Sequence, residues 1–263
     1  MNLAKSTSVS LSVIVALFAL ELNADSIYNA SKILPKTQAI THVMPNFGAI
    51  SDVKTKKRQF FSFLLPMIRD SNREILSHRE LLLEIRDLVK NEAPLTNSIR
   101  HFVGGLSRRY KVNLDNDLLA QIHELLLKVD VVPESLVLAQ AANESGWGTS
   151  RFAQEANNLF GIWCFTPGCG LTPLSRDEGL THEVARYGSV TESIEAYMHT
   201  INTNPAYIDL RQIRAESRGN ADVMNGLTLA EGLINYSARG SDYVKEIQQL
   251  IRVNKLQEFN LPV

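Results

Sequence analysis

The feature that most constrains this chain is an apolar helix that is predicted to end on a carboxylate. Pro133 suits a helix start, and residues 136–142 are mostly strong helix formers without charge. Glu144 follows on the last predicted turn, just before Gly146, which can end a helix in a left-handed conformation. A helix that is apolar on most sides has to be buried, so the fold must surround it and accommodate Glu144 at its end.

Glu144 is predicted to have a raised pKa. Apolar neighbours and the negative end of the helix dipole both disfavour the charged form of a carboxyl group. A carboxyl group that keeps its proton near neutral pH can serve as a general acid. The alternative is a surface glutamate in a salt bridge at the helix end, which would carry no chemistry.

The composition is that of an ordinary globular chain and argues against a nucleic-acid partner. Of 263 residues, 44% are hydrophobic and 21% are charged, and the net charge is -1. Lys and Arg are balanced by Asp and Glu, and no dense basic stripe appears. A neutral polymer or a small ligand is the expected partner.

Residues 1–24 have the pattern of a secretory signal peptide. Lys5 precedes a short apolar run over residues 9–20, and Leu22-Asn-Ala24 forms an acceptable cleavage site. The run is short for a membrane span, so no stable span is expected after cleavage. We expect a periplasmic or cell-envelope location; the alternative is an uncleaved inner-membrane anchor, because Leu22 is not the small residue preferred there.

Export bears on Cys164 and Cys169, the two cysteines of the chain. In an oxidising compartment, their short Phe-Thr-Pro-Gly loop can close as a disulfide. The alternative is a pair of free buried thiols. Two cysteines without a nearby histidine cluster do not predict a zinc site, and we expect neither a metal nor another cofactor.

Helical periodicity and turn signals predict a mainly α fold with one small β lobe. Residues 25–50 lack periodicity and resemble a linker, whereas residues 51–129 form a helical N-terminal extension, with two amphipathic helices at 52–91. The remaining domain, residues 130–263, has turn signals and a strand-like segment within 158–188. Further helices are predicted at 96–110, 115–129, 192–202, 206–216, 227–234 and 240–253.

An ordered set of short motifs resembles the family 73 glycoside hydrolases, which are peptidoglycan N-acetylglucosaminidases with a lysozyme-like fold. The likeness is closer to the Bax-like branch across the Trp-Cys and Glu-Gly-x-x-His-Glu-Val segments, and it covers about residues 130–255. It implies a lysozyme-like α lobe with a small β hairpin lobe. The motifs are Glu144-Ser-Gly-Trp-Gly, Arg151-Phe, Asn157-Asn-Leu-Phe-Gly-Ile-Trp163, Tyr187 with Ser189, and Asn204-Pro-Ala-Tyr207.

The resemblance implies an exported enzyme that cleaves β-1,4 bonds of peptidoglycan glycan strands at N-acetylglucosamine. Glu144 would protonate the leaving oxygen, and the segment from Asn157 would form a cleft opposite it. Trp163 and Trp147 can stack on pyranose rings, and Asn158 can hydrogen-bond an acetamido group. The alternatives are a core wedge for Trp147 and turn roles for the two asparagines.

Glycoside hydrolysis usually needs a second carboxylate. The candidates on the predicted hairpin are Asp177, Glu178 and Glu183, with Glu178 and Glu183 ranked equally; each could instead be a solvated surface charge. Without such a group, the acetamido oxygen of the substrate would act as nucleophile, and Tyr207 would orient it or stabilise the developing charge. The alternative for Tyr207 is a core tyrosine with a satisfied hydroxyl.

Two other functions fit the same motifs. A lytic transglycosylase also uses one glutamate at a helix end, but cleaves without water and leaves an anhydro sugar. A noncatalytic wall-binding protein could retain a degenerate site. No protein partner can be inferred from the chain.

Overall fold

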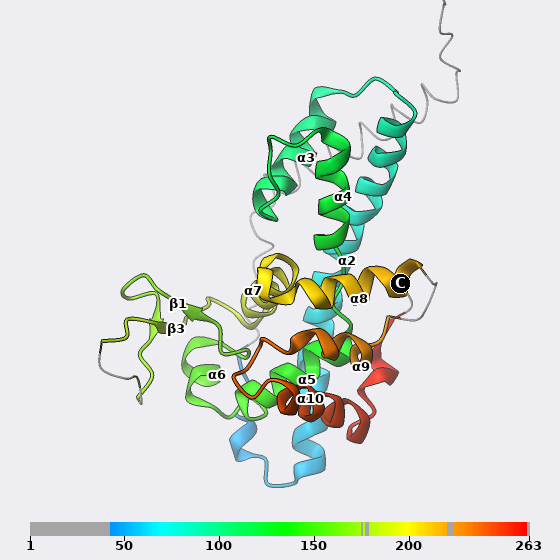
Figure 1. Cartoon of the computed structure of the whole chain (residues 1–263). Helices are drawn as coiled ribbons and strands as arrows, with labels where there is room; N and C mark the ends of the chain where they lie inside the picture. The colour runs from blue at the N-terminus through cyan, green and yellow to red at the C-terminus, as the bar shows by residue number, and fades with distance from the viewer. Residues whose placement is uncertain (1–42, 175, 177–178, 220–223, 262–263) are drawn as a thin grey trace, which may run out of the picture. The chain divides into compact units, whose positions relative to one another are not determined.

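The protein is mainly helical and contains one small antiparallel sheet, which confirms the expected fold class (Figure 1). The structure is a computed structural model and describes residues 43–174, 176, 179–219 and 224–261. The expected signal peptide lies outside the described residues, as do most of the expected linker and the candidates Asp177 and Glu178. No helix in the described ranges has the length and apolarity needed to cross a membrane.

Helices lie at most of the positions that the sequence patterns predict, and α6 is a helix that they did not predict. The α-helices are α2 (Val53–Lys90), α3 (Asn97–Arg109), α4 (Leu118–Lys128), α5 (Glu134–Ser145), α6 (Arg151–Ala156), α7 (Val190–Thr203), α8 (Ile208–Gly219), α9 (Gly226–Leu229) and α10 (Ser241–Val253). The strands are β1 (Trp163–Cys164), β2 (Gly170–Leu171) and β3 (Glu183–Ala185). Short 3-10 helices are η1 (Phe47–Ala49), η2 (Pro205–Tyr207), η3 (Ala230–Leu233) and η4 (Leu256–Phe259).

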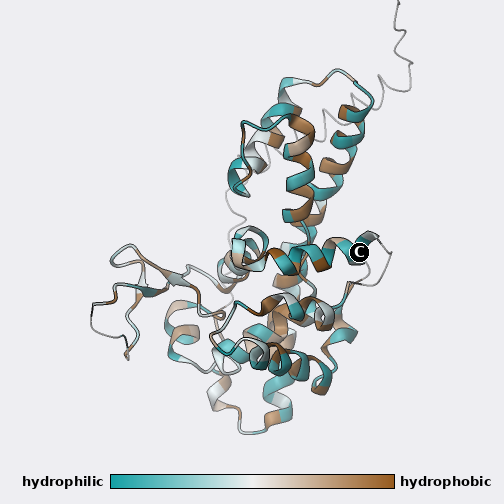
Figure 2. Ribbon diagram, viewed as in Figure 1, coloured by the Kyte–Doolittle hydropathy of each residue, from teal (hydrophilic) through white to brown (hydrophobic). Residues whose placement is uncertain are grey.

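The chain divides into two compact units, and the second unit is built from two separate stretches of the sequence. Among the described residues, the first unit comprises 77–126 and the second comprises 43–76 and 127–261. In the first unit, apolar and polar residues alternate along α3 and α4 (Figure 2), and Ile99, Phe102 and Ile122 are buried. The boundary expected between residues 129 and 130 stays a prediction, but residues 53–76 belong to the same unit as Glu144.

The prediction of two helices within 52–91 is wrong, because α2 is one continuous helix of 38 residues. The polar residues in the middle of α2 remain helical because their side chains find hydrogen-bond partners. Ser71 Oγ donates to Met67 O at 3.0 Å. Asn72 binds the backbone of Val132 with both ends of its amide, at 2.9 Å and 3.1 Å. Buried polar groups that are satisfied in this way do not interrupt a helix.

The α5 helix is the centre of the second unit. All of its residues are buried except Asn143 and Glu144, and it packs against α9, α10 and η4. Gly146 ends the helix with φ of 55°, and its N–H donates to Ala142 O. Ten of the twelve residues therefore lie in the core, and the helix presents its carboxylate beside the left-handed turn that ends it.

The left-handed turn after α5 rests on the segment that was expected to be a linker. Trp147 and Gly148 continue the turn with φ of 61° and 74°. A β carbon on Gly148 would lie 2.7 Å from Phe47 Cδ2, a distance that only glycine avoids. Phe47 is fully buried and meets the Phe60 ring edge-on at 5.3 Å. In its described part, residues 43–50, this segment is thus anchored by an aromatic side chain.

The small sheet has the order β1-β3-β2, with antiparallel pairing throughout. Trp163 pairs with Val184 and Cys164 pairs with Glu183, while Gly170 pairs with Ala185. A β carbon on Gly170 would lie 1.9 Å from Val184 O, so β2 can approach β3 only with glycine there. The α6 helix packs against β2 and connects the sheet to the rest of the unit (Figure 1).

A buried ionic cluster joins Asp130, in the segment that leads into α5, to α8. Asp130 and Arg214 are 2% and 1% exposed, and the Asp130 carboxylate accepts from Arg218 Nη2 at 2.6 Å and from Arg218 Nε at 2.7 Å. Arg214 Nε lies 3.8 Å from Asp130 Oδ2. The carboxylate also accepts from Val131 N at 2.8 Å, which fixes the chain just before the helix that carries Glu144.

Replacing Asp130 with alanine should strongly destabilise the protein. Asp130→Ala leaves the buried Arg214 guanidinium without its carboxylate, and we expect the free energy of unfolding to fall by about 3–5 kcal/mol. Urea unfolding followed by circular dichroism measures this change. Asp70→Ala is the control, since Asp70 and Arg73 form an exposed pair and its removal should cost less than about 0.5 kcal/mol. Equal losses in the two variants would contradict a central role for the cluster.

Candidate active site

Glu144 lies half-buried at the end of α5 with one carboxylate oxygen fully engaged. Its Oε1 accepts a hydrogen bond from Tyr243 Oη at 2.7 Å and one from Asn143 Nδ2 at 3.4 Å. Burial raises the pKa of Glu144 above its ordinary value, although these two hydrogen bonds pull it down. The side chain therefore has the environment that a general acid needs.

The hydrogen bond from Tyr243 is the last step of a one-way chain of donors. The Tyr197 hydroxyl donates to Gln140 Oε1, and Gln140 Nε2 donates to Tyr243 Oη at 2.9 Å. Because a phenol has one proton and Tyr243 already accepts from Gln140, that proton is committed to Glu144. Burial, followed by the charge of Glu144, raises the pKa of Tyr243, so its hydroxyl stays protonated.

The donor chain distinguishes the two oxygens of the Glu144 carboxyl group. Oε1 receives two donors, so the acid form carries its proton on Oε2. That oxygen lies towards Gly161, where a β carbon would come within 3.9 Å of it. Gly161 adopts a φ of 66° and closes the Asn-Asn-Leu-Phe-Gly segment. Oε2 of Glu144 thus lies beside the backbone that leads into the small sheet.

Two further tyrosines, Tyr236 and Tyr207, lie near the Glu144 carboxyl group. The Tyr236 ring stacks on Tyr243 at 5.3 Å between centroids and lies 5.9 Å from the ring of Tyr207. Tyr236 Oη donates to Phe160 O at 2.9 Å. Burial is the main cause that raises the pKa of Tyr207, and the charge of Glu144 adds to it, which places this phenol within the field of the carboxylate. The catalytic role expected for Tyr207 stays a prediction.

Asn158 is almost fully buried and holds the segment before β1 in place. Its Nδ2 donates to Ile162 O and to Ala185 O, both at 2.9 Å. Its Oδ1 accepts from Ile162 N at 3.1 Å and from Phe160 N at 3.3 Å. The amide therefore supports the loop beside Glu144. Its expected contact with an acetamido group stays a prediction, and would have to replace one of these bonds.

The two tryptophans occupy different environments. The Trp147 ring lies 5.4 Å from Phe61 and 5.9 Å from Phe60, and Lys57 Nζ lies 4.6 Å over its face. Trp163 is 56% exposed and stacks on His182 with centroids 4.0 Å apart. Substrate contact stays a prediction for both residues, but Trp163 has an open ring face and Trp147 packs against phenylalanines.

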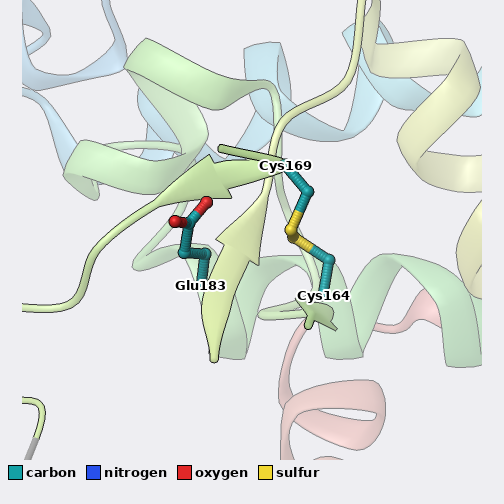
Figure 3. Close-up of side chains that lie close together, drawn as sticks. All are labelled: Cys164, Cys169 and Glu183. Carbon is teal, nitrogen blue, oxygen red and sulfur yellow. A yellow bond between two sulfur atoms is a disulfide. The ribbon is translucent and has the colours of Figure 1, made fainter. Parts of the chain in front are cut away.

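Glu183 is bound to the turn that the cysteines close. Cys164 and Cys169 form a disulfide, and Glu183 lies beside it (Figure 3). The Glu183 carboxylate accepts from Gly170 N at 2.7 Å and from Gly168 N at 3.1 Å, and these bonds lower its pKa. Cys164, Cys169 and Glu183 also form a cluster with ligand atoms within 4.8 Å, but the sulfurs are bonded to each other. The catalytic role expected for Glu183 stays a prediction.

Sequence reasoning did not single out Tyr243, Tyr236, Tyr197 or Gln140. Gln140 could have been noticed, because it is the polar residue in the middle of an apolar run and a buried amide needs partners. Tyr243 lies on the predicted helix 240–253, where it looks like an ordinary apolar position. Its contact with Glu144 joins residues 99 positions apart, which no local pattern indicates.

Comparison with known proteins identifies the family. The profile described as "Glucosaminidase: Mannosyl-glycoprotein endo-beta-N-acetylglucosaminidase" matches residues 120–256, which contain the described site. The chain belongs to the glucosaminidase family. Membership makes it a glycoside hydrolase, and it confirms the resemblance read from the sequence motifs.

The chain is also similar to individual proteins. This glucosaminidase is 30% identical to "Protein bax" of Escherichia coli strain K12 over 209 residues, which covers 79% of this chain and 73% of that protein. It is 25% identical to "Peptidoglycan hydrolase FlgJ" of Salmonella typhimurium, covering 49% of this chain and 45% of FlgJ. The solved catalytic domain of the autolysin Auto from Listeria monocytogenes is 19% identical to this chain, with a TM-score of 0.44. The match covers 81% of this chain and 92% of that domain.

Removing the Tyr243 hydroxyl should raise the pKa of Glu144 further. The hydrogen bond from Tyr243 favours the charged carboxylate, so Tyr243→Phe removes a contribution that lowers the pKa. Nuclear magnetic resonance titration of carbon-13-labelled glutamate side chains measures the shift, and we expect the midpoint of Glu144 to move to higher pH.

Tyr236→Phe is the matched control, because the Tyr236 hydroxyl donates to Phe160 O. The pKa of Glu144 should change less in this variant than in Tyr243→Phe. A Glu144 midpoint that stays fixed or falls in Tyr243→Phe would contradict the assigned direction of the hydrogen bond.

Proposed function

We propose that the protein is an exported peptidoglycan hydrolase that cleaves β-1,4 bonds of the glycan strand at N-acetylglucosamine, with Glu144 as the general acid. The observation that carries the proposal is the half-buried Glu144 carboxyl, whose Oε1 is held by Tyr243 and whose pKa is raised. Family membership supports the reaction, and the FlgJ relatives are named peptidoglycan hydrolases. A substrate in the cell wall also supports the expected envelope location.

The proposed acid step begins with the proton on Glu144 Oε2. This proton passes to the glycosidic oxygen as the bond between that oxygen and the sugar carbon breaks, and the leaving sugar departs with a hydroxyl group. Glu144 then becomes a carboxylate. The hydrogen bond from Tyr243 strengthens at that moment, because hydrogen bonds to charged acceptors are the stronger ones. Tyr243 therefore stabilises the product of proton transfer more than the starting acid.

Three groups compete for the second catalytic role. The two backbone hydrogen bonds of Glu183 support a structural task for its carboxylate, so we rank it after Glu178. The third candidate is the acetamido oxygen of the substrate, with Tyr207 beside it. The anomer of the first product separates inversion, in which a carboxylate activates water, from retention, in which a carboxylate or the acetamido group attacks the sugar carbon.

Replacing Glu144 with glutamine should abolish hydrolysis while the protein still binds glycan. The amide cannot supply a proton, and we expect the rate to fall by about 10²–10⁴-fold. Release of reducing ends from purified peptidoglycan measures the rate, and mass spectrometry identifies the product. A reducing N-acetylglucosamine end is the expected product of the unaltered protein.

Glu155→Gln provides the matched control, since Glu155 is an exposed glutamate on α6 that pairs with Arg151. It should keep nearly full activity. Anhydromuramic ends in the digest would replace the proposal with a lytic transglycosylase. Glycan binding by an unaltered protein that cleaves nothing would indicate a noncatalytic wall-binding protein.

A further inference from the structure

The small sheet has two chemically different sides. Side chains alternate along a strand, and residues paired across two strands share a side. Trp163 pairs with Val184, so it lies on the same side as His182, which precedes β3. Cys164 pairs with Glu183 on the opposite side, where the disulfide and the carboxylate lie (Figure 3). One side of the sheet is thus aromatic and the other is cross-linked.

On the aromatic side, Trp163 presents one free ring face. The ring lies nearly parallel to His182, with an interplanar angle of 18° and centroids 4.0 Å apart. His182 is 9% exposed, whereas Trp163 is 56% exposed. The imidazole therefore covers one face of the indole and fixes its orientation, and the other face is open to solvent.

Trp163 lies close along the chain to the backbone beside Glu144. Gly161 lies beside Glu144 Oε2, and Trp163 follows two residues later. Two residues of extended chain span at most about 7 Å. An extended polymer bound at Glu144 can therefore pass over Trp163, whereas a small ligand held by the acid site alone need not reach it.

We propose that the open face of Trp163 is a stacking platform for one pyranose ring of the glycan strand, at a subsite beside the cleaved bond. This proposal rests on the proposed function, because it takes the same polymer as its ligand. A flat aromatic surface of this kind excludes water from the apolar face of a sugar while leaving the sugar hydroxyls at the rim hydrated. The proposed occupant is thus a neutral N-acetylhexosamine unit of the strand.

The cross-linked side of the sheet holds the platform in position. The disulfide closes the loop between β1 and β2, and Glu183 binds the N–H groups of Gly168 and Gly170 in that loop. β1 is two residues long and carries Trp163 directly before Cys164. With so short a strand, the cross-link and the carboxylate restrain the backbone that aims the indole, so Glu183 is a positioning residue in this proposal.

Binding to the Glu144→Gln protein tests the platform without turnover. The probe is glycan strands stripped of peptide, with calorimetry as the measurement. Adding Trp163→Ala should weaken the affinity about tenfold, which corresponds to about 1.4 kcal/mol, and Trp163→Phe should restore part of it. In the protein that keeps Glu144, Trp163→Ala should raise KM more than it lowers kcat, as loss of a ground-state contact does.

Leu174→Ala is the matched control, because Leu174 is 93% exposed in the loop that follows β2. Its affinity for the strands should be unchanged. An unchanged affinity in Trp163→Ala would overturn the platform. Sedimentation that shows Trp163 joining two copies of the chain, with strand affinity intact, would also overturn it.

Reduction of the disulfide tests the positioning. A dithiol reductant cleaves the Cys164–Cys169 bond to two thiols and is itself oxidised to a cyclic disulfide. We expect weaker strand binding after reduction of the Glu144→Gln protein, and no further loss when Trp163→Ala is present. Equal losses in both backgrounds would show that the cross-link does not act through Trp163.

The two proposals fail in different ways. If the unaltered protein does not cleave strands and Glu144→Gln does not bind them, the proposed function is wrong. If the unaltered protein cleaves strands while Trp163→Ala keeps both its affinity and its KM, the platform alone is wrong.

Discussion

The rest of the structure depends on the burial of α5. A helix that hides ten of its twelve residues needs neighbours on nearly every side, and α9, α10 and η4 supply them. The same burial removes water from around Glu144 and raises its pKa. Core packing and the raised pKa of Glu144 therefore share one cause, because the helix that the fold must cover is also the helix that carries this carboxyl group.

Burial alone would leave the carboxyl group free to rotate and to exchange its proton between two oxygens. The chain of donors from Tyr197 through Gln140 to Tyr243 restricts that freedom, since the Tyr243 hydroxyl accepts from Gln140 and has one proton, which it donates to Glu144 Oε1. The cost of burying these polar groups is offset because each one finds a partner. The carboxylate of Glu183 in the small sheet is likewise held by hydrogen bonds, which it accepts from two backbone N–H groups.

Local patterns could predict most of the fold and the central residue of the site. Helical spacing, the Pro133 start and the Gly146 stop all act within a few residues, so α5 and the place of Glu144 could be read directly. The prediction of two helices in place of α2 failed because of distant contacts. The polar residues in its middle are satisfied by partners such as Val132, 60 positions along the chain, which a local pattern cannot reveal. Tyr243 was missed for the same reason, since its task is set by a distant partner.

The contact of Phe47 with Gly148 links the lead-in segment to the end of α5. The aromatic ring occupies the place of a missing side chain, so neither position can change size without a response from the other. The two residues are 101 positions apart, yet they form one packing unit with Phe60. A side chain at Gly148 would also meet Phe60 and would be strained by the positive φ, so a smaller residue at Phe47 does not by itself free Gly148. The turn beside Glu144 is thus held both by its backbone conformation and by a segment about a hundred residues earlier.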